Sequence, residues 1–395
     1  MQKVLRLFLL LVAASSPALA QRNIGEVTVQ AENKTIPVRV SANTPELNDL
    51  AVRAFGVHGR YRRTASDFAY DIKFSLVTPT EVRVDITKGR AAAPFSSDVA
   101  TGRDAADALL RAADIAVEKT NGMGLKGFFT AKIAFVGESS GRNEIYTGDL
   151  FFRHVTQVTH DKAFALTPRW SPDGTKLLYT SFYRSGFPDI FLIDLNTYQR
   201  TTFVSFKGTN SGARFSPSGG QVAMVLSGEG TPEIYLANAQ GRQVSRKTRS
   251  DAVKASPCFS PDGSRLVFSM EPGPQLYVMS VAGGTPTRVT SGISGYCAEP
   301  DWSRGDPNKI AFTVKQGSRF QIAVLDLAKR TSEIVGKAAF DGVEPAWLAD
   351  GRHVVYTARD RSTNVLCILD TETGKSTPIS PKSFGSAMKA SVWAR

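Results

Sequence analysis

Short apolar runs alternate with polar, glycine-rich segments from about residue 130 to the C-terminus of this chain. Turn-like segments precede several of the runs, and the clearest is Ser171-Pro172-Asp173-Gly174. Pro fixes φ at the first corner of a tight turn, and Gly accepts the positive φ that follows. Short apolar runs bounded by such turns predict strands, not helices. The runs are Leu177–Tyr179, Val222–Val225, Leu266–Phe268, Ile310–Phe312 and Val354–Tyr356.

One aromatic position marks a fixed period in this pattern. All four tryptophans occupy it, phenylalanine takes it twice, and successive positions lie 45, 44, 43, 45 and 46 residues apart. A period in the forties is typical of WD40-like (PD40) repeats, each of which forms one blade of a β-propeller. We expect these side chains to form the blade core, packed between neighbouring blades, with carbohydrate stacking as the alternative. They are Trp170, Phe215, Phe259, Trp302, Trp347 and Trp393.

The two ends of the array complement each other. Ile133–Phe135 and Glu144–Tyr146 read as the middle of a blade with no start, whereas Ala390–Trp393 reads as a start with nothing after it. Pairing the two halves predicts six blades over residues 129–395, closed by the C-terminal strand. Closure removes the exposed sheet edges that the alternative, an open solenoid, would leave.

The first 20 residues are typical of a cleavable signal peptide. Lys3 and Arg6 precede an apolar core at Leu7–Ala14, and Ala18-Leu19-Ala20 fits a small-residue cleavage site. The core is too short to span a bilayer. We therefore expect an exported, periplasmic chain that begins at Gln21 and is at most peripheral to a membrane.

Residues 21–128 lack the period and predict a small α+β domain. Ile24–Gln30 and Ile36–Val40 read as strands, and Thr44-Pro45-Glu46 opens a helix with Thr44 as N-cap. A hairpin of Ile72–Leu76 and Val82–Ile86 follows. The spacing of apolar residues then predicts a second helix over about 104–120. The fold class is therefore mainly β: a six-bladed propeller preceded by an α+β domain.

Net charge indicates which classes of partner the chain could bind, and the cysteine content bears on disulfide bonding. The formal charge of +12 falls to +10 without Lys3 and Arg6, which suits anionic lipid or cell-wall polymer, although a basic surface can also be merely solvated. No nucleic-acid motif is present. Cys258, Cys297 and Cys367 leave two alternatives open, one disulfide with one thiol or three buried thiols. We expect no cofactor and no structural metal, with a calcium ion in the channel as a weaker alternative.

The segments just before the aromatic position predict the binding site. In a propeller they lie at the mouth of the channel, where their charges either contact a folded partner or pair across the channel. We take the charged members as candidate partner-binding residues: Arg169, Arg214, Lys254, Glu299 and Glu344. The aspartates Asp173, Asp262 and Asp350 are interpreted as turn formers.

Catalytic motifs give little support for an enzyme. Gly137-Glu138-Ser139-Ser140-Gly141 matches the G-x-S-x-G pattern, but a nucleophile elbow needs a helix after the serine, and here a strand is expected. The four histidines, His58, His154, His160 and His353, have no context typical of a catalytic triad.

The chain resembles the TolB family of the Tol-Pal envelope system. The most specific stretch runs from Val117-Glu118-Lys119-Thr120 through Gly124–Phe129 to Thr130–Val136, and the downstream repeats agree in type, number and spacing. Two turns depart from the pattern, at Ser218 and at Ser303–Pro307.

The resemblance implies a non-enzymatic periplasmic scaffold. Its channel mouth would bind the peptidoglycan-associated lipoprotein Pal, with contacts that correspond to Ala255 and Ser256. The start of the mature chain would engage the inner-membrane protein TolA through Gln21, Arg22, Asn23, Ile24, Gly25, Glu26 and Val27. The alternatives are a propeller hydrolase or lyase, and a propeller outside Tol-Pal that binds an envelope polymer or small ligand through an aromatic-lined channel.

Overall fold

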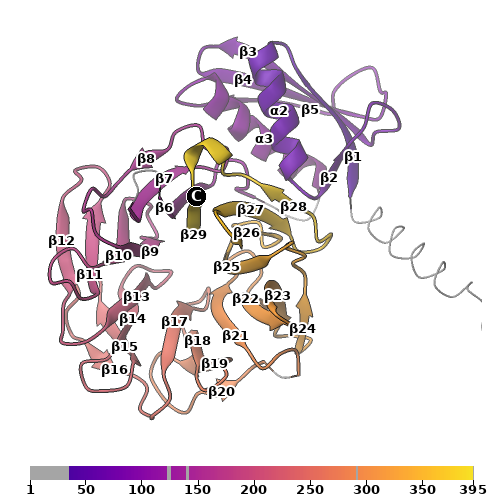
Figure 1. Ribbon diagram of the computed structural model, residues 1–395. Coiled ribbons are helices and arrows are strands. Elements are labelled where there is room, and N and C mark those ends of the chain that lie inside the picture. The colour runs from indigo at the N-terminus through magenta and orange to yellow at the C-terminus, as the bar shows by residue number, and fades with distance from the viewer. Residues whose placement is uncertain (1–34, 122–125, 139–141, 291, 395) are drawn as a thin grey trace, which may run out of the picture.

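A computed structural model describes residues 35–121, 126–138, 142–290 and 292–394 as a small N-terminal domain beside a propeller (Figure 1). The expected signal peptide, the strand at Ile24–Gln30 and the segment Gln21–Val27 lie outside the described residues. Within the described residues, neither helix is long and apolar enough to cross a bilayer.

The N-terminal domain is a five-stranded sheet with two helices that pack on it and on each other. The strand order is β2-β1-β3-β4-β5, and β1 pairs in parallel with both β2 and β3. Helix α2 (Pro45–Val57) begins as predicted, because the Thr44 hydroxyl accepts a hydrogen bond from Leu47 N–H at 3.3 Å. The remaining elements are β1 (Ile36–Ala42), β2 (Tyr61–Arg63), β3 (Tyr70–Thr78), β4 (Glu81–Lys88), β5 (Ser96–Thr101) and α3 (Ala105–Asn121).

The propeller consists of six four-stranded antiparallel sheets, as the repeat predicts. The innermost strands, in blades 1 to 6, are β29 (Ala387–Trp393), β9 (Ala165–Trp170), β13 (Asn210–Phe215), β17 (Lys254–Phe259), β21 (Cys297–Trp302) and β25 (Asp341–Trp347). The second strands are β6 (Lys132–Gly137), β10 (Lys176–Ser181), β14 (Gln221–Leu226), β18 (Arg265–Met270), β22 (Lys309–Gln316) and β26 (His353–Arg359).

The outer half of each blade is less regular than the inner half. The third strands are β7 (Glu144–Asp149), β11 (Asp189–Asp194), β15 (Glu233–Asn238), β19 (Gln275–Ser280), β23 (Arg319–Asp326) and β27 (Asn364–Asp370). The outermost strands are β8 (Thr156–Gln157), β12 (Arg200–Val204), β16 (Ser245–Arg246), β20 (Thr287–Arg288), β24 (Thr331–Ile334) and β28 (Ser376–Pro378). A single 3-10 turn, η1 (Lys382–Phe384), leads into β29.

The C-terminal strand closes the ring as predicted. β29 pairs antiparallel with β6, and Trp393 lies opposite Lys132 in the register. This blade therefore contains both ends of the repeat array, and its sheet order is β29-β6-β7-β8. Each innermost strand is therefore paired with the second strand of its own blade, and closure removes the open edge that an incomplete first blade would leave.

The aromatic repeat position forms the cores between blades. In blades 2 to 6 the aromatic side chain packs with apolar residues of the preceding blade; Phe215, for example, shares a core with Leu178 and Ile190 of blade 2. Trp393 of blade 1 is half-buried and packs against the core between blades 1 and 2. At the closure, the indole N–H of Trp170 donates to the Ser391 carbonyl at 3.2 Å, and that of Trp393 donates to the Pro172 carbonyl at 3.0 Å. The expected core role is confirmed.

Because neighbouring strands of each blade run in opposite directions, the loops that connect them lie on two opposite faces of the propeller. The Ser-Pro-Asp-Gly-type turns after the innermost strands lie on one face, here called the turn face. The loops that lead into the innermost strands lie on the other, the mouth face.

All three cysteines are free and buried, which confirms the thiol alternative and overturns the disulfide one.

The N-terminal domain docks on the turn face, beside blades 6 and 1 (Figure 1). Phe128 and Phe129 are buried in a core that includes Phe55 of the N-terminal domain and Leu348 and Val355 of blade 6. The two domains therefore share one continuous core, which fixes the docking of the N-terminal domain.

Candidate functional site at the channel mouth

One residue of each innermost strand has left-handed backbone geometry. It lies three residues before the aromatic position in blades 2 to 6 and four before it in blade 1, and the strand pairing shifts register there. The six residues, called the bulge ring, are Thr167 (φ 50°), Gly212 (63°), Ser256 (55°), Glu299 (55°), Glu344 (58°) and Lys389 (54°).

A bulge turns a side chain away from the normal pleat, and here it turns five toward the channel, since the sixth bulge residue is Gly212. All six residues line one cavity, together with Arg169 and Arg214. Positive φ is costly for β-branched and charged residues, and such strain persists where the surrounding structure enforces it, most often at functional sites. The sequence does not predict this feature, because only Gly212 is of the residue type that signals positive φ.

Hydrogen bonds link the bulge ring around blades 5, 6 and 1. The Glu299 carboxylate accepts from the Thr313 hydroxyl at 2.7 Å and from the Glu344 N–H at 3.1 Å. The Glu344 carboxylate accepts from the Thr357 hydroxyl at 2.9 Å and pairs with the Lys389 ammonium group. These bonds fix the carboxylates in place before any partner arrives.

Burial raises the pKa of Glu299, and the nearby Glu344 carboxylate raises it further. Of the two carboxylates, Glu344 is the one in an ion pair, with Lys389. The mouth therefore holds a carboxyl group, Glu299, in an environment that opposes its charged form.

Two arginines form the opposite side of the mouth and reach deeper. Arg214 of blade 3 crosses the channel to Asp301 of blade 5, with 2.6 Å between Nη1 and Oδ1. Burial and the nearby Arg214 charge lower the pKa of Arg169 to about 10. Its Nη1 donates to the Ala390 carbonyl at 3.4 Å. Arg169 therefore lacks a carboxylate at hydrogen-bonding distance within the described residues.

The predicted candidates divide into two groups. Arg169, Arg214, Ser256, Glu299 and Glu344 do come together at the mouth, as predicted. Their charges pair in part across the channel and between neighbouring blades, as the pairing alternative predicts, whereas contact with a folded partner stays a prediction.

The prediction for Lys254 is wrong. Its side chain is 1% exposed, with its ammonium 2.8 Å from Glu233 of blade 3 and 2.6 Å from the Ser250 hydroxyl. Lys254 opens β17 on the side that faces blade 3, so the buried Glu233 captures it. Ala255 is exposed beside Ser256 but does not line the cavity.

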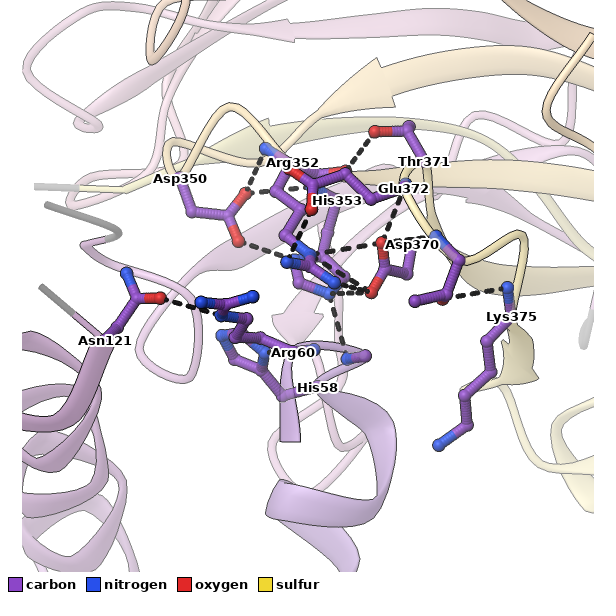
Figure 2. A network of polar contacts seen from close by, with 12 residues as sticks. His58, Arg60, Asn121, Asp350, Arg352, His353, Asp370, Thr371, Glu372 and Lys375 are labelled. Atoms are coloured by element: carbon purple, nitrogen blue, oxygen red, sulfur yellow. Dashed lines mark hydrogen bonds and ion pairs between the residues drawn. The ribbon is translucent and has the colours of Figure 1, made fainter. Parts of the chain in front are cut away.

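A second polar cluster lies where the two domains meet (Figure 2). The Gly59 N–H donates to His353 Nε2 at 3.0 Å, and His353 Nδ1 bonds to Asp350 Oδ2 at 2.6 Å. The ring of His58 lies 4.5 Å from that of His353, and both residues are 0% exposed. Burial, followed by the neighbouring His353, holds the pKa of His58 well below its usual range.

Arginine and lysine side chains complete this junction cluster. Arg352 pairs with Asp370 at 2.7 Å and with Glu372 at 2.8 Å. Lys375 reaches across to donate to the Gly56 carbonyl of the N-terminal domain at 2.6 Å. The cluster therefore joins two turns of blade 6 to the last turn of helix α2 and the residues after it.

Asp350 forms a turn as expected, accepting the Arg352 N–H at 3.0 Å, and it has a second contact that the sequence does not predict. It is buried, and it orients His353 toward the N-terminal domain. His58, Asp350 and His353 lie close enough together to hold a metal ion, but bonds to Asp350 and Gly59 already engage both ring nitrogens of His353. Asp173 and Asp262 form turns as expected, each accepting a backbone N–H two residues on.

The G-x-S-x-G match lies in a hairpin, as expected. Strand β6 precedes it and strand β7, at Glu144–Asp149, follows it, although residues 139–141 themselves lie outside the described residues. The described element that follows the match is therefore a strand, where a nucleophile elbow requires a helix.

Comparison with known proteins agrees with this architecture. A TolB protein homolog from Chlorobium chlorochromatii is 37% identical over 145 residues, and a Tol-Pal system protein TolB from Bordetella pertussis is 30% identical over 164 residues. These alignments cover 37% and 41% of this chain and only 32% and 37% of the relatives, about a third of their length.

Solved structures agree in fold. The crystal structure of TolB from Acinetobacter baumannii matches with a TM-score of 0.80 at 23% identity, covering 91% of this chain and 97% of that one. A putative TolB from Agrobacterium tumefaciens matches with a TM-score of 0.51 at 19% identity, covering 67% and 98%. The family model for the TolB β-propeller domain matches residues 120–395. This chain belongs to the TolB β-propeller family.

Proposed function

We propose that this protein is a non-enzymatic periplasmic scaffold of the Tol-Pal envelope-integrity system. In this proposal, residues 1–20 are a cleaved signal peptide. The mouth face binds a Pal-type peptidoglycan-associated lipoprotein, and the N-terminal segment Gln21–Val27 engages a TolA-type inner-membrane protein. Family membership supports the system, and the arrangement of the bulge ring supports the site.

The observation that carries the proposal is the combination of strain and charge at the mouth. Ser256, Glu299 and Glu344 hold left-handed backbone geometry, and the carboxylates are oriented by neighbouring threonines before binding. Such pre-orientation lowers the entropy lost when a partner docks. The strain has no evident benefit for the blade itself, so recognition is the reason we assign to it.

The lining of the mouth favours a polar protein partner over a polymer or small ligand that binds to aromatic side chains. Threonine, serine, arginine, glutamate, lysine and proline side chains line the cavity, and its lining contains no aromatic residue. Arg169 and Arg214 lie on one side, where Arg214 is already paired with Asp301, and Glu299 and Glu344 lie on the other, where Glu344 is already paired with Lys389. A folded partner with a matching charge pattern would be held in one orientation.

The test is calorimetric titration of the chain from Gln21 to Arg395 with the soluble domain of the Pal-type lipoprotein from the same source. We expect saturable binding, weakened roughly tenfold or more by Glu299→Gln, because a hydrogen bond to a charged group contributes about 1.5–3 kcal/mol. Glu333→Gln is the matched control: Glu333 lies exposed on the outermost strand of the same blade.

If Glu299→Gln and Glu333→Gln weaken binding equally, the prediction that the binding site lies at the mouth is wrong, although the predicted partner is correct. Absence of binding by the unmodified chain at high micromolar concentration would refute the proposed partner. A parallel titration with the soluble C-terminal domain of the TolA-type protein, with and without Gln21–Val27, tests the second contact: affinity unchanged by the deletion would refute that role.

A further inference from the structure

Exposed aromatic side chains gather on one blade of the propeller. Phe164 is 59% exposed, Tyr183 51%, Phe187 68% and Phe206 51%. Across the rest of the described propeller, the other large hydrophobic side chains with comparable exposure are Tyr198, Val253 and Phe340. Contiguous exposed apolar surface is rare on soluble proteins and usually marks an interaction site.

Topology places the four rings together on the mouth face. Phe164 precedes β9, Tyr183 and Phe187 lie in the loop between β10 and β11, and Phe206 lies between β12 and β13. These three loops, residues 159–164, 182–188 and 205–209, emerge from the same end of blade 2. Tyr198 belongs to the turn between β11 and β12 and therefore lies on the opposite face.

One backbone hydrogen bond and two bonds from the Asn210 side chain link the three loops. The Phe182 N–H donates to the Phe164 carbonyl at 3.1 Å. The Asn210 side chain donates to the Pro188 carbonyl at 3.1 Å and to the Phe206 carbonyl at 2.8 Å. The rings are thus presented on a fixed support, so docking them would cost little conformational entropy.

The exposed charged side chains of these loops are all positive, although the buried carboxylates of Glu144 and Asp189 accept bonds from the loops. Lys162, Arg184 and Lys207 are exposed in these loops, all of whose residues the structure describes. The one carboxylate of the loops, Asp161, is already paired with Arg200, whose guanidinium also lies 4.1 Å from the centre of the Tyr183 ring. The surface therefore offers apolar rings and unpaired positive charge, which is complementary to an anionic partner.

Two features favour a lipid surface over a protein. Phenylalanines on loop tips with flanking Lys and Arg are typical of segments that enter the boundary between headgroups and acyl chains. Two of the three cations are lysines, which protein interfaces tend to exclude. We propose that these three loops, called the blade-2 loop surface, bind an anionic phospholipid bilayer, with Phe187 and Phe206 inserted at the level of the headgroups.

The test is co-sedimentation of the Gln21–Arg395 chain with vesicles of phosphatidylglycerol and phosphatidylcholine, compared with vesicles of phosphatidylcholine alone. We expect binding to the anionic vesicles that weakens as salt is raised. The double substitution Phe187→Ser, Phe206→Ser should weaken it roughly tenfold or more, because two inserted rings are lost. A Lys162→Glu, Lys207→Glu variant should abolish the preference for anionic lipid.

Tyr198→Ser is the matched control, since Tyr198 is 53% exposed on the same blade but on the opposite face. All substituted side chains are exposed, so an unchanged melting temperature will confirm that each variant folds. Failure of the unmodified chain to bind anionic vesicles overturns the inference. So does equal loss in the Tyr198 control, or weakened binding to the Pal-type domain with vesicle binding unchanged, which would assign the rings to a protein interface.

Discussion

At the scale of single residues, the mouth of the channel is built against local stability. Thr167, Ser256, Glu299 and Glu344 adopt a backbone region that their side chains disfavour. Glu299 in addition is buried beside a second carboxylate. Residues that reduce stability and persist at a cavity usually serve recognition, and replacing them tends to stabilise the fold while weakening function.

We predict that Glu299→Gln raises the melting temperature at neutral and alkaline pH by roughly 1–3 °C. The folded state raises the pKa of Glu299, so the contribution of this group to stability is present in acid and lost as pH rises through the folded pKa. The advantage of glutamine should therefore vanish near pH 4, close to the pKa of an unfolded glutamate. Thermal unfolding of both chains from pH 4 to 8 measures it.

Glutamine keeps an oxygen that can accept the bond from the Glu344 N–H, so the substitution removes the charge and little else. Glu333→Gln again serves as the control, and its melting temperature should follow the unmodified chain at every pH. A Glu299→Gln chain that melts lower at pH 7.5 would show that the ionised carboxylate stabilises the mouth.

At the scale of elements, two turns of blade 6 connect the propeller to the N-terminal domain. The turn before β26 presents His353 to the Gly59 N–H, and the turn after β27 presents Lys375 to the Gly56 carbonyl. The approach is close: a Cβ atom on Gly59 would lie 1.9 Å from Asp370 Oδ2. Glycine is required at this position by the opposing side chain and not by its own backbone conformation.

We predict that Gly59→Ala destabilises the protein by about 1–3 kcal/mol, the usual range for inserting an atom into a packed site. The added methyl group displaces Asp370 and, through it, the Arg352 and His353 contacts. Urea unfolding would measure the loss, and limited proteolysis would show whether the domain junction opens first. Gly295→Ala is the control, since a Cβ there meets nothing within 4 Å.

An unfolding midpoint for Gly59→Ala within error of the Gly295→Ala control would contradict this account of the junction. A lowered midpoint with an unchanged protease pattern would mean that the strain spreads through the shared core instead of opening the contact.

At the scale of the whole molecule, ring closure and domain docking depend on the same region. Blade 1 is completed by β29, which carries Trp393 into the core beside Trp170, with 6.2 Å between the ring centres. The core of the N-terminal domain continues into blades 1 and 6 through Phe128 and Phe129. Loss of the last strand should therefore weaken both the ring and the attachment of the N-terminal domain.

We predict that deletion of residues 387–395 leaves a chain that does not unfold cooperatively and associates through the exposed edge of β6. Circular dichroism during heating and size-exclusion chromatography measure the two effects. A synthetic peptide of residues 385–395 added in trans should restore a cooperative transition, because it can pair with β6. A truncated chain that melts at the temperature of the full chain would refute closure as a source of stability.

Much of the fold was predictable because its signals are local and repeated. Helix α2 begins at its predicted cap, and the aromatic position recurs once per blade. Strands β2 and β5 escaped prediction because β2 is three residues long and β5 is mostly polar, so neither carries a pattern. Within the site, Glu299 and Glu344 were identified from position, whereas Lys254 was misplaced because its partner Glu233 lies in another blade.

The sequence by itself determined the six-bladed ring, its closure by the C-terminal strand and the α+β character of the first domain, because turn chemistry and periodicity are properties of neighbouring residues. Only the tertiary structure decided the pairing of charges at the mouth, the buried contact of His58 with His353, and the gathering of four exposed rings on blade 2. Each of these features brings together residues that are far apart in the chain or that lie in separate loops. Such contacts depend on the folded arrangement, so no local pattern or repeat in the sequence predicts them.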